Sequence, residues 1–175
     1  MADPFLDVTQ VNNEWSAMSN AIQSALQHNK TYRSESDYGM RDAFRSKWSK
    51  LIREKSVNYV QPVSDAQHCE AIQSISDRLR VKFGQLLCDG HLRYGTSQKA
   101  LNLYLRFLWR LGKVATPPHC PVDRIVLNAG GIYGVWTKYD SVNEYMGWVN
   151  GLRARPRPLS LSEWEHQIWL RSVAK

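Results

Sequence analysis

The sequence predicts an all-α protein of about six or seven helices, folded as a single compact domain over residues 1–175. Apolar residues recur at three- and four-residue steps in several stretches, which is the spacing of a helix with one buried face. The chain has 175 residues and is 43% hydrophobic, so it is long enough to bury a core and too apolar to remain disordered. Residues 96–112 are apolar almost all round. We therefore expect this helix, capped by Thr96 or Ser97, at the centre of the fold.

The apolar spacing in the N-terminal part of the sequence predicts two helices separated by a polar turn. Apolar residues from Val8 to Leu26 fall on one helical face, which includes Trp15. Residues 29–37 are polar and turn-like, and a second helical pattern follows with Trp48 on its apolar face. We expect Trp15 on the buried face of its helix, and Trp48 in the core rather than on a base-stacking surface.

A third helix is predicted to start after Ser64. Ser64 and Gln67 have the spacing of a capping box, and apolar residues repeat helically from Ile72 to Leu86. The run before this helix, Val57–Val60, is predicted to be extended and to end at Pro62. The third helix leads directly into the central one.

Glycines and aromatic residues follow the central region. Gly130, Gly131 and Gly134 break the preceding helix and allow a close backbone approach. Four aromatic side chains come next, and we expect at least three of them in the core; they are Trp136, Tyr139, Tyr145 and Trp148. Ser160 or Ser162 then opens a final helix.

Positive charge is concentrated in the middle of the sequence. The formal net charge is +7, and residues 78–113, with eight basic residues and one acidic residue, account for all of it (8 − 1 = +7). The segments before and after carry −2 and +2, which cancel. Phosphate groups are the natural partner for such a concentration, so we expect a nucleic-acid partner. A merely solvated basic face is the alternative.

Seven basic residues are candidates for phosphate contacts. Residues 153–158 form a basic connector that its prolines hold extended, and its arginines suit bidentate phosphate binding. A solvated linker is the alternative for this connector. The candidate contacts are Arg78, Arg80, Lys82, Arg93, Arg153, Arg155 and Arg157.

No stretch of the sequence has the pattern of a membrane span or a targeting segment. No apolar run approaches the roughly 18 residues needed to cross a bilayer, and the start MADPFLDVTQ has neither the basic nor the apolar part of a signal peptide. Three cysteines leave one unpaired in any disulfide scheme, which fits a reducing compartment. We therefore expect a cytoplasmic protein with no membrane partner, associated with the nucleoid if the cell is prokaryotic.

The sequence does not predict a metal site or a cofactor. Cys88, His91, His119 and Cys120 are residues of the kind that bind zinc. Their spacing lacks two well-formed ligand pairs, and adjacent ligands such as His119 and Cys120 fit poorly into one tetrahedron.

Two residues carry the candidate chemistry, and both stand at helix starts. Lys99 lies in the first turn of the central helix, where free amides and the helix dipole favour anions over cations. An amine held there can act as a nucleophile that forms a Schiff base with a sugar carbon, whereas most first-turn lysines are solvated or bind phosphate. Asp123 follows the proline-rich residues 117–122 at the start of the next helix, where capping is its default role. This spacing can bring the Lys99 amine and the Asp123 carboxylate together at the opening of one site.

A longer pattern surrounds these two residues. The chain carries Ser97-Gln98-Lys99-Ala100, then a helix of aromatic and aliphatic residues, then Pro-His-Cys-Pro-Val-Asp-Arg at positions 118–124. This pattern, within residues 95–127, resembles the helix-hairpin-helix DNA glycosylase superfamily, most closely its archaeal 8-oxoguanine DNA glycosylase branch. In that branch a similar lysine is the nucleophile and the aspartate of a Pro-Val-Asp sequence is essential, so the resemblance assigns these roles to Lys99 and Asp123. Leu92-Arg93-Tyr94-Gly95-Thr96 stands in place of the superfamily's Leu-Pro-Gly-x-Gly hairpin signature.

The resemblance implies a glycosylase-like fold with its hairpin and active site in residues 84–127. It also implies a function, the excision of a damaged or modified base from duplex DNA, with strand cleavage through a Schiff base on Lys99. His119, Trp136 and Trp148 are the candidates for contacts with a flipped base. Two other functions remain open. A non-catalytic DNA-binding protein would use Lys99 as a phosphate contact, and a helical protein-interaction module would use exposed tryptophans.

Overall fold

The structure, a computed structural model, describes residues 3–27, 29–35, 37–155 and 159–173. Within this part of the chain the regular secondary structure is helical, apart from one isolated bridge between Tyr32 and Leu87. The predicted all-α class is therefore confirmed. The α-helices are α1 (Pro4–Thr9), α2 (Glu14–Leu26), α3 (Tyr38–Ser56), α4 (Asp65–Phe83), α5 (Tyr94–Arg110), α6 (Arg124–Ala129), α7 (Val142–Arg153) and α8 (Leu161–Val173), with short 3-10 helices η1 (Val57–Val60) and η2 (Gly84–Leu86).

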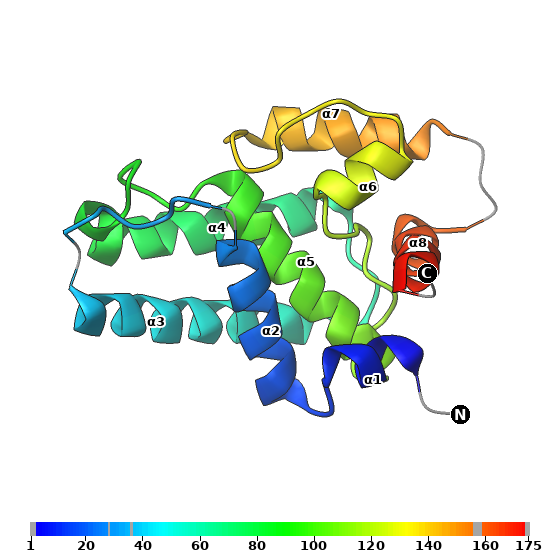
Figure 1. Cartoon of the computed structure of the whole chain (residues 1–175), viewed down its shortest axis with the longest axis horizontal. Coiled ribbons are helices and arrows are strands. Elements are labelled where there is room, and N and C mark those ends of the chain that lie inside the picture. Colours follow the sequence, from blue (N-terminus) through cyan, green and yellow to red (C-terminus); the bar gives the residue numbers. More distant parts are fainter. Residues whose placement is uncertain (1–2, 28, 36, 156–158, 174–175) are drawn as a thin grey trace.

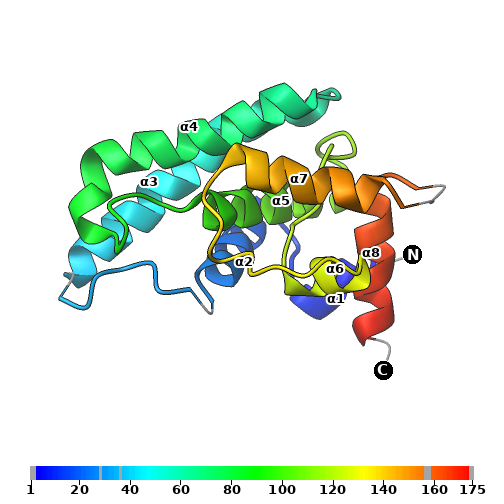
Figure 2. The same ribbon diagram turned by 90° about the horizontal axis from the view of Figure 1, so that it is seen from above.

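Helix α5 runs through the centre of the molecule (Figure 1), as its apolar sequence predicts. Helices α2, α4 and α7 pack against it. Seen from above, α7 lies over α5, while α3 and α4 lie side by side along one edge and α6 lies toward the other (Figure 2). All residues of α5 are buried except Lys99, Leu103, Trp109 and Arg110. Lys99 is therefore the one residue in the first two turns of α5 whose side chain reaches the surface.

The start of α5 differs from the prediction. The helix begins at Tyr94, and neither Thr96 nor Ser97 caps it. The Tyr94 amide instead donates to Asp140 Oδ1 at 2.9 Å, and the Ser97 hydroxyl donates to the Ile72 carbonyl at 3.0 Å. The prediction was wrong because the group that satisfies the first amide comes from a residue 46 positions later in the chain.

The N-terminal pattern forms two helices instead of one. The chain leaves α1 at Gln10, whose φ of 55° is left-handed, and α2 restarts with a capping box between Asn13 and Ser16. The break changes which side chains face the core. Trp15 is 72% exposed and Val8 is 59% exposed, so the prediction that Trp15 lies on a buried face is wrong.

Helices α3 and α4 form an antiparallel pair joined by η1. Trp48 is completely buried between them and the rest of the core, as predicted. The capping box of Ser64 and Gln67 is also confirmed. The prediction for Val57–Val60 is wrong, because this run continues α3 as a 3-10 turn that buries Tyr59. The Tyr59 hydroxyl contacts His68 Nδ1 at 2.7 Å, which ties this turn to α4.

The C-terminal helices complete the core. Trp136, Tyr139 and Tyr145 are buried and Trp148 is partly buried, which confirms that at least three of these aromatic residues belong to the core. Ser160 caps α8, since its hydroxyl accepts from the Glu163 amide at 3.3 Å. No helix in the described ranges combines the length and apolarity that a membrane crossing requires.

Candidate functional site

Lys99 and Asp123, which the sequence singles out separately, are in contact. Lys99 Nζ lies 2.8 Å from Asp123 Oδ2, and the two side chains are 13% and 18% exposed. The first turn of α5 supplies the lysine, and the residue before α6 supplies the aspartate. The contact therefore joins an amine and a carboxylate at two helix starts, in partial shelter from water.

The Asp123 carboxylate uses each of its oxygens for a different partner. Oδ1 accepts hydrogen bonds from the amides of Ile125 at 2.9 Å and Val126 at 3.1 Å, so Asp123 is the N-cap of α6. Oδ2 faces Lys99. The capping bonds fix the orientation of the carboxylate, and this orientation presents the free oxygen to the amine. Capping and a role in the site are compatible here.

Trp136 forms the third side of the cluster. The Lys99 ammonium nitrogen lies 4.7 Å from the centroid of the Trp136 ring, within the range of a cation–π interaction. Gly95 makes this approach possible. A Cβ atom at Gly95 would lie 2.1 Å from the carbonyl oxygen of Trp136, so only glycine lets this segment of the chain pack against the start of α5.

The cluster opens into a pocket of about 440 Å³. This volume lies in the range of small-molecule sites. Lys99, Asp123 and Trp136 form one part of the wall, and the rest comes from the end of α2, the start of α6 and the loop around Trp136; these residues are Ser24, Gln27, Arg124, Ile125, Gly134, Val135 and Thr137. The sequence did not predict the contribution of α2, because Ser24 and Gln27 belong to no recognisable motif.

A smaller pocket of about 150 Å³ shares Lys99 and Asp123 and is also lined by Arg106 and Glu165. Arg106 Nη1 and Glu165 Oε1 form a buried ion pair at 2.7 Å. Burial raises the pKa of Glu165 to about 7, against the opposing effect of the Arg106 charge. Arg106 belongs to the basic segment of the sequence, yet it is 3% exposed and stacks over the Phe5 ring. It is therefore unavailable to a phosphate group.

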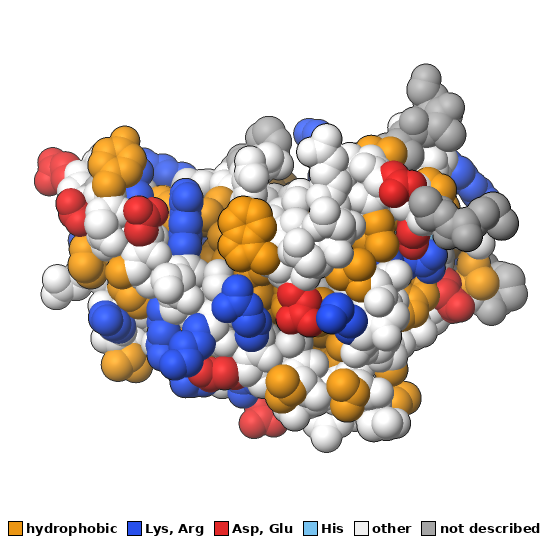
Figure 3. Space-filling model, turned by 90° about the horizontal axis from the view of Figure 1, so that it is seen from below, with side chains coloured by type: hydrophobic (Ala, Val, Ile, Leu, Met, Phe, Trp, Pro, Cys, Tyr) orange, Lys and Arg blue, Asp and Glu red, His pale blue; other side chains and the backbone are white. Residues whose placement is uncertain are grey.

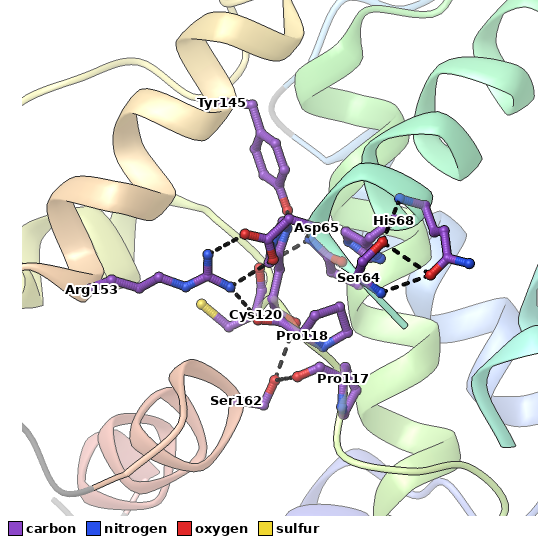
Figure 4. A network of polar contacts seen from close by, with 12 residues as sticks. Ser64, Asp65, His68, Pro117, Pro118, Cys120, Tyr145, Arg153 and Ser162 are labelled. Atoms are coloured by element: carbon purple, nitrogen blue, oxygen red, sulfur yellow. Dashed lines mark hydrogen bonds and ion pairs between the residues drawn. The ribbon is translucent and has the colours of Figure 1, made fainter. Parts of the chain in front are cut away.

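His119 lies in a buried network, away from this pocket. Its Nδ1 contacts the Tyr145 hydroxyl at 2.7 Å, and its Nε2 contacts Asp65 Oδ1 at 2.9 Å. Arg153 completes the network from α7 by binding Asp65 through both terminal nitrogens, at 2.5 and 2.9 Å (Figure 4). Burial lowers the pKa of His119 to about 4, and Asp65 opposes this effect. His119 thus connects α4 to α7 and lines neither pocket at Lys99.

Trp148, the other base-contact candidate, lies behind the pocket wall. Its ring meets Tyr139 edge-on, with centroids 4.3 Å apart. A Cβ atom at Gly134 would lie 2.6 Å from the Trp148 ring, so the loop packs directly on this side chain. Trp136 is therefore the only one of the three candidates that the described structure places at Lys99.

The candidate phosphate contacts are spread over the surface. Arg93 is the one tied to the pocket, because its Nη1 donates to the carbonyl of Thr137 at 2.8 Å. Arg78 pairs with Glu54 on α3 at 2.7 Å, and Arg80 and Lys82 are exposed on α4. In Figure 2, α4 lies along the edge of the molecule opposite α6. Of the connector, Arg155 is exposed beside Gly131, and Arg157 lies outside the described residues.

Comparisons of the chain with protein-family models, with curated proteins and with solved structures find no match. In the described part of the chain, no three histidine, cysteine, aspartate or glutamate side chains converge as metal ligands would. The groups that meet at the site are a primary amine and a fixed carboxylate, with an indole ring and a pocket next to them.

Proposed function

We propose that this protein is a DNA glycosylase that removes a damaged or modified base and cleaves the strand through a Schiff base on Lys99. The observation that carries the proposal is the 2.8 Å contact of Lys99 and Asp123 at a pocket. The match of these two residues to the glycosylase pattern Lys…Pro-Val-Asp supports it independently, because that pattern concerns sequence alone.

In the proposed mechanism a base is flipped out of the duplex into the pocket. Asp123 Oδ2 accepts a proton from the Lys99 ammonium, and the neutral amine attacks the anomeric carbon of the sugar. The bond from this carbon to the base breaks, and the base leaves with the bonding electrons and takes up a proton. Asp123 also stabilises the positive charge that develops on the sugar. The attached nitrogen loses a proton and forms a double bond to the anomeric carbon, while the bond from this carbon to the ring oxygen breaks and that oxygen takes up a proton. Loss of a proton from C2′ of this Schiff base then eliminates the 3′ phosphate and cuts the strand.

Non-catalytic DNA binding is the competing function. The Lys99 ammonium is already held by the Asp123 carboxylate and the Trp136 ring. These contacts join α5, α6 and the loop around Trp136, as a purely structural cluster would also do. The two functions differ in whether the amine ever leaves its carboxylate to form a bond.

Borohydride trapping on duplex DNA with an abasic site separates the two functions. The abasic aldehyde forms a Schiff base with the nucleophilic amine whatever base the enzyme prefers, and borohydride makes this bond permanent. We expect a covalent adduct with the wild type and none with Lys99→Gln. Lys113→Gln is the matched control, because Lys113 also forms an ion pair, with Glu14 at 2.9 Å, but lies at the surface. An adduct that persists in Lys99→Gln would contradict the proposal.

A further inference from the structure

Helix α3 carries the highest net formal charge of the described helices, although charge summed along the sequence hides this. It carries six basic residues and only two acidic ones, Asp42 and Glu54; the basic residues are Arg41, Arg45, Lys47, Lys50, Arg53 and Lys55. Its charge of +4 is cancelled in the profile by acidic residues elsewhere in positions 1–77. Figure 3, the view from below Figure 1, shows lysine and arginine side chains gathered where α3 faces the reader.

A groove of about 650 Å³ lies between this basic helix and α2. Arg45, Ser49 and Arg53 line it from α3. Trp15, the most exposed of the large side chains on α2, lines it from the other side. The capping box of Asn13 and Ser16 holds the turn that carries Trp15. The groove therefore combines an exposed aromatic side chain, carried on a capped helix turn, with two guanidinium groups.

The composition of the groove favours a nucleic-acid strand over an amphipathic helix. A helix would need an apolar floor, but Met18 and Ile22 are only 3% and 6% exposed. Apart from Trp15, the accessible apolar lining is the half-buried Leu26, and Ser19, Gln23, Gln27 and Ser49 add polar groups beside the two arginines. Arginines that bind phosphates and an aromatic ring that stacks on a base are the features of single-strand binding sites.

The groove adjoins the candidate active site. Gln27, at the C-terminal end of α2, lines both the groove and the Lys99 pocket. The neighbouring residues of the same helix divide between the two, since Gln23 faces the groove and Ser24 faces the pocket. The pocket and the groove therefore lie on two sides of the end of α2, so one DNA strand can contact both.

We propose that the groove between α2 and α3 binds a single-stranded segment of DNA that flanks the nucleotide held at Lys99. Trp15 stacks on a base of this segment, and Arg45 and Arg53 bind its phosphates. This inference rests on the proposed function and specifies which DNA substrates the enzyme prefers. The preferred DNA has an unpaired flank next to the reacting nucleotide, and the groove, rather than the exposed end of α4, supplies the main phosphate contacts.

Binding measurements with matched DNA substrates test the groove. Fluorescence anisotropy would compare an abasic duplex with the same duplex extended by about six unpaired nucleotides on the 5′ or the 3′ side of the site. We expect one of the extensions to tighten wild-type binding about tenfold or more, since stacking on an aromatic side chain contributes about 1–3 kcal/mol per base. Trp15→Ala should lose this gain while binding the unextended duplex as the wild type does. Because Trp15 is 72% exposed, the variant should fold normally, which thermal unfolding verifies.

The arginine variants test the same groove by charge. Arg45→Gln should reduce the salt dependence of binding to the extended DNA by about one phosphate contact. Arg80→Gln is the comparison, because Arg80 is also exposed but lies on α4, outside the groove. If neither extension tightens binding, or if Trp15→Ala keeps the gain, the proposal that the groove binds a single-stranded flank is contradicted.

Trapping with borohydride on the same DNAs separates the two proposals. If the adduct forms but the unpaired extension does not tighten binding, the lyase proposal stands and the proposed role of the groove is rejected. If the extension tightens binding in a way that depends on Trp15 but no adduct forms, the proposed role of the groove is supported and the lyase proposal is rejected.

Discussion

At the scale of single residues, Asp123 shows how one side chain can cap a helix and also present an oxygen to a neighbouring amine. Oδ1 caps α6 and Oδ2 faces the amine of Lys99. The sequence presents capping and chemistry as alternatives, because spacing cannot show which oxygen points where. The structure shows that Asp123 caps α6 and contacts Lys99 at the same time, so substitutions can test the two contacts separately.

Asp123→Asn should preserve the cap and eliminate the chemistry. An asparagine oxygen caps a helix about as well as an aspartate oxygen, but the amide can neither pair with the Lys99 ammonium nor accept its proton. We expect base release and borohydride trapping to be lost, with DNA affinity unchanged or slightly higher. Asp123→Ala should also lose the cap and about 1 kcal/mol of stability. Single-turnover kinetics and urea unfolding of both variants would check this, and an active Asp123→Asn protein would reduce Asp123 to a cap.

Gly95→Ala should disturb the site through the backbone. The new methyl group would lie 2.1 Å from the Trp136 carbonyl oxygen. The loop must therefore move away from α5, and this movement separates the Trp136 ring from Lys99. We expect a lower urea midpoint and a slower trapping reaction. Gly147→Ala is the matched control, because nothing lies within 4 Å of a Cβ at that exposed helical position. There alanine should stabilise α7 slightly. Equal behaviour of the two variants would contradict the account of this close approach.

At the scale of elements, the sequence predicted those features whose causes are local. The apolar pattern placed α5 at the centre, the capping box placed the start of α4, and the Pro-Val-Asp pattern placed the start of α6. Features with distant causes were missed. The cap of α5 comes from Asp140, and Arg106 is neutralised by Glu165, 59 residues away.

The exposed face of α2 was missed for a different reason. Apolar spacing from Val8 to Leu26 is compatible with one long helix, and no residue type marks the left-handed Gln10 that interrupts it. Once the chain turns there, Trp15 points outward. The basic face of α3 was hidden in the same way, because charge summed along the sequence does not follow charge on one surface.

At the scale of the whole molecule, three buried histidines should make the fold sensitive to acid. Burial lowers the pKa of His119 and of His166 to about 4, and lowers that of His68 as well. In the unfolded chain histidines titrate near 6.5, so below that pH the unfolded state binds more protons than the folded state. Stability conferred by the neutral histidines is therefore lost as the pH falls from about 6.5 toward about 4.

Urea unfolding at pH 7 and pH 5 would measure this effect. We expect a clearly lower midpoint at pH 5, although Glu165 opposes it in part, because its raised pKa makes its protonated form favour the folded state in the same range. His166→Gln should reduce the difference between the two pH values, because a glutamine oxygen can still accept from Arg106 Nη2 and does not titrate. Equal or greater stability at pH 5 in the wild type would show that the histidines do not control the acid response.

The central claim is that Lys99 is the nucleophile of a lyase, and the most direct test is to locate the covalent bond. The wild-type protein would be trapped on abasic DNA with borohydride, digested with a protease, and the DNA-linked peptide identified by mass spectrometry. We predict that the modified residue is Lys99, and that Asp123→Asn gives little or no modified peptide under the same conditions. Modification at another lysine or at the N-terminal amine, with Lys99 unmodified, would contradict the account.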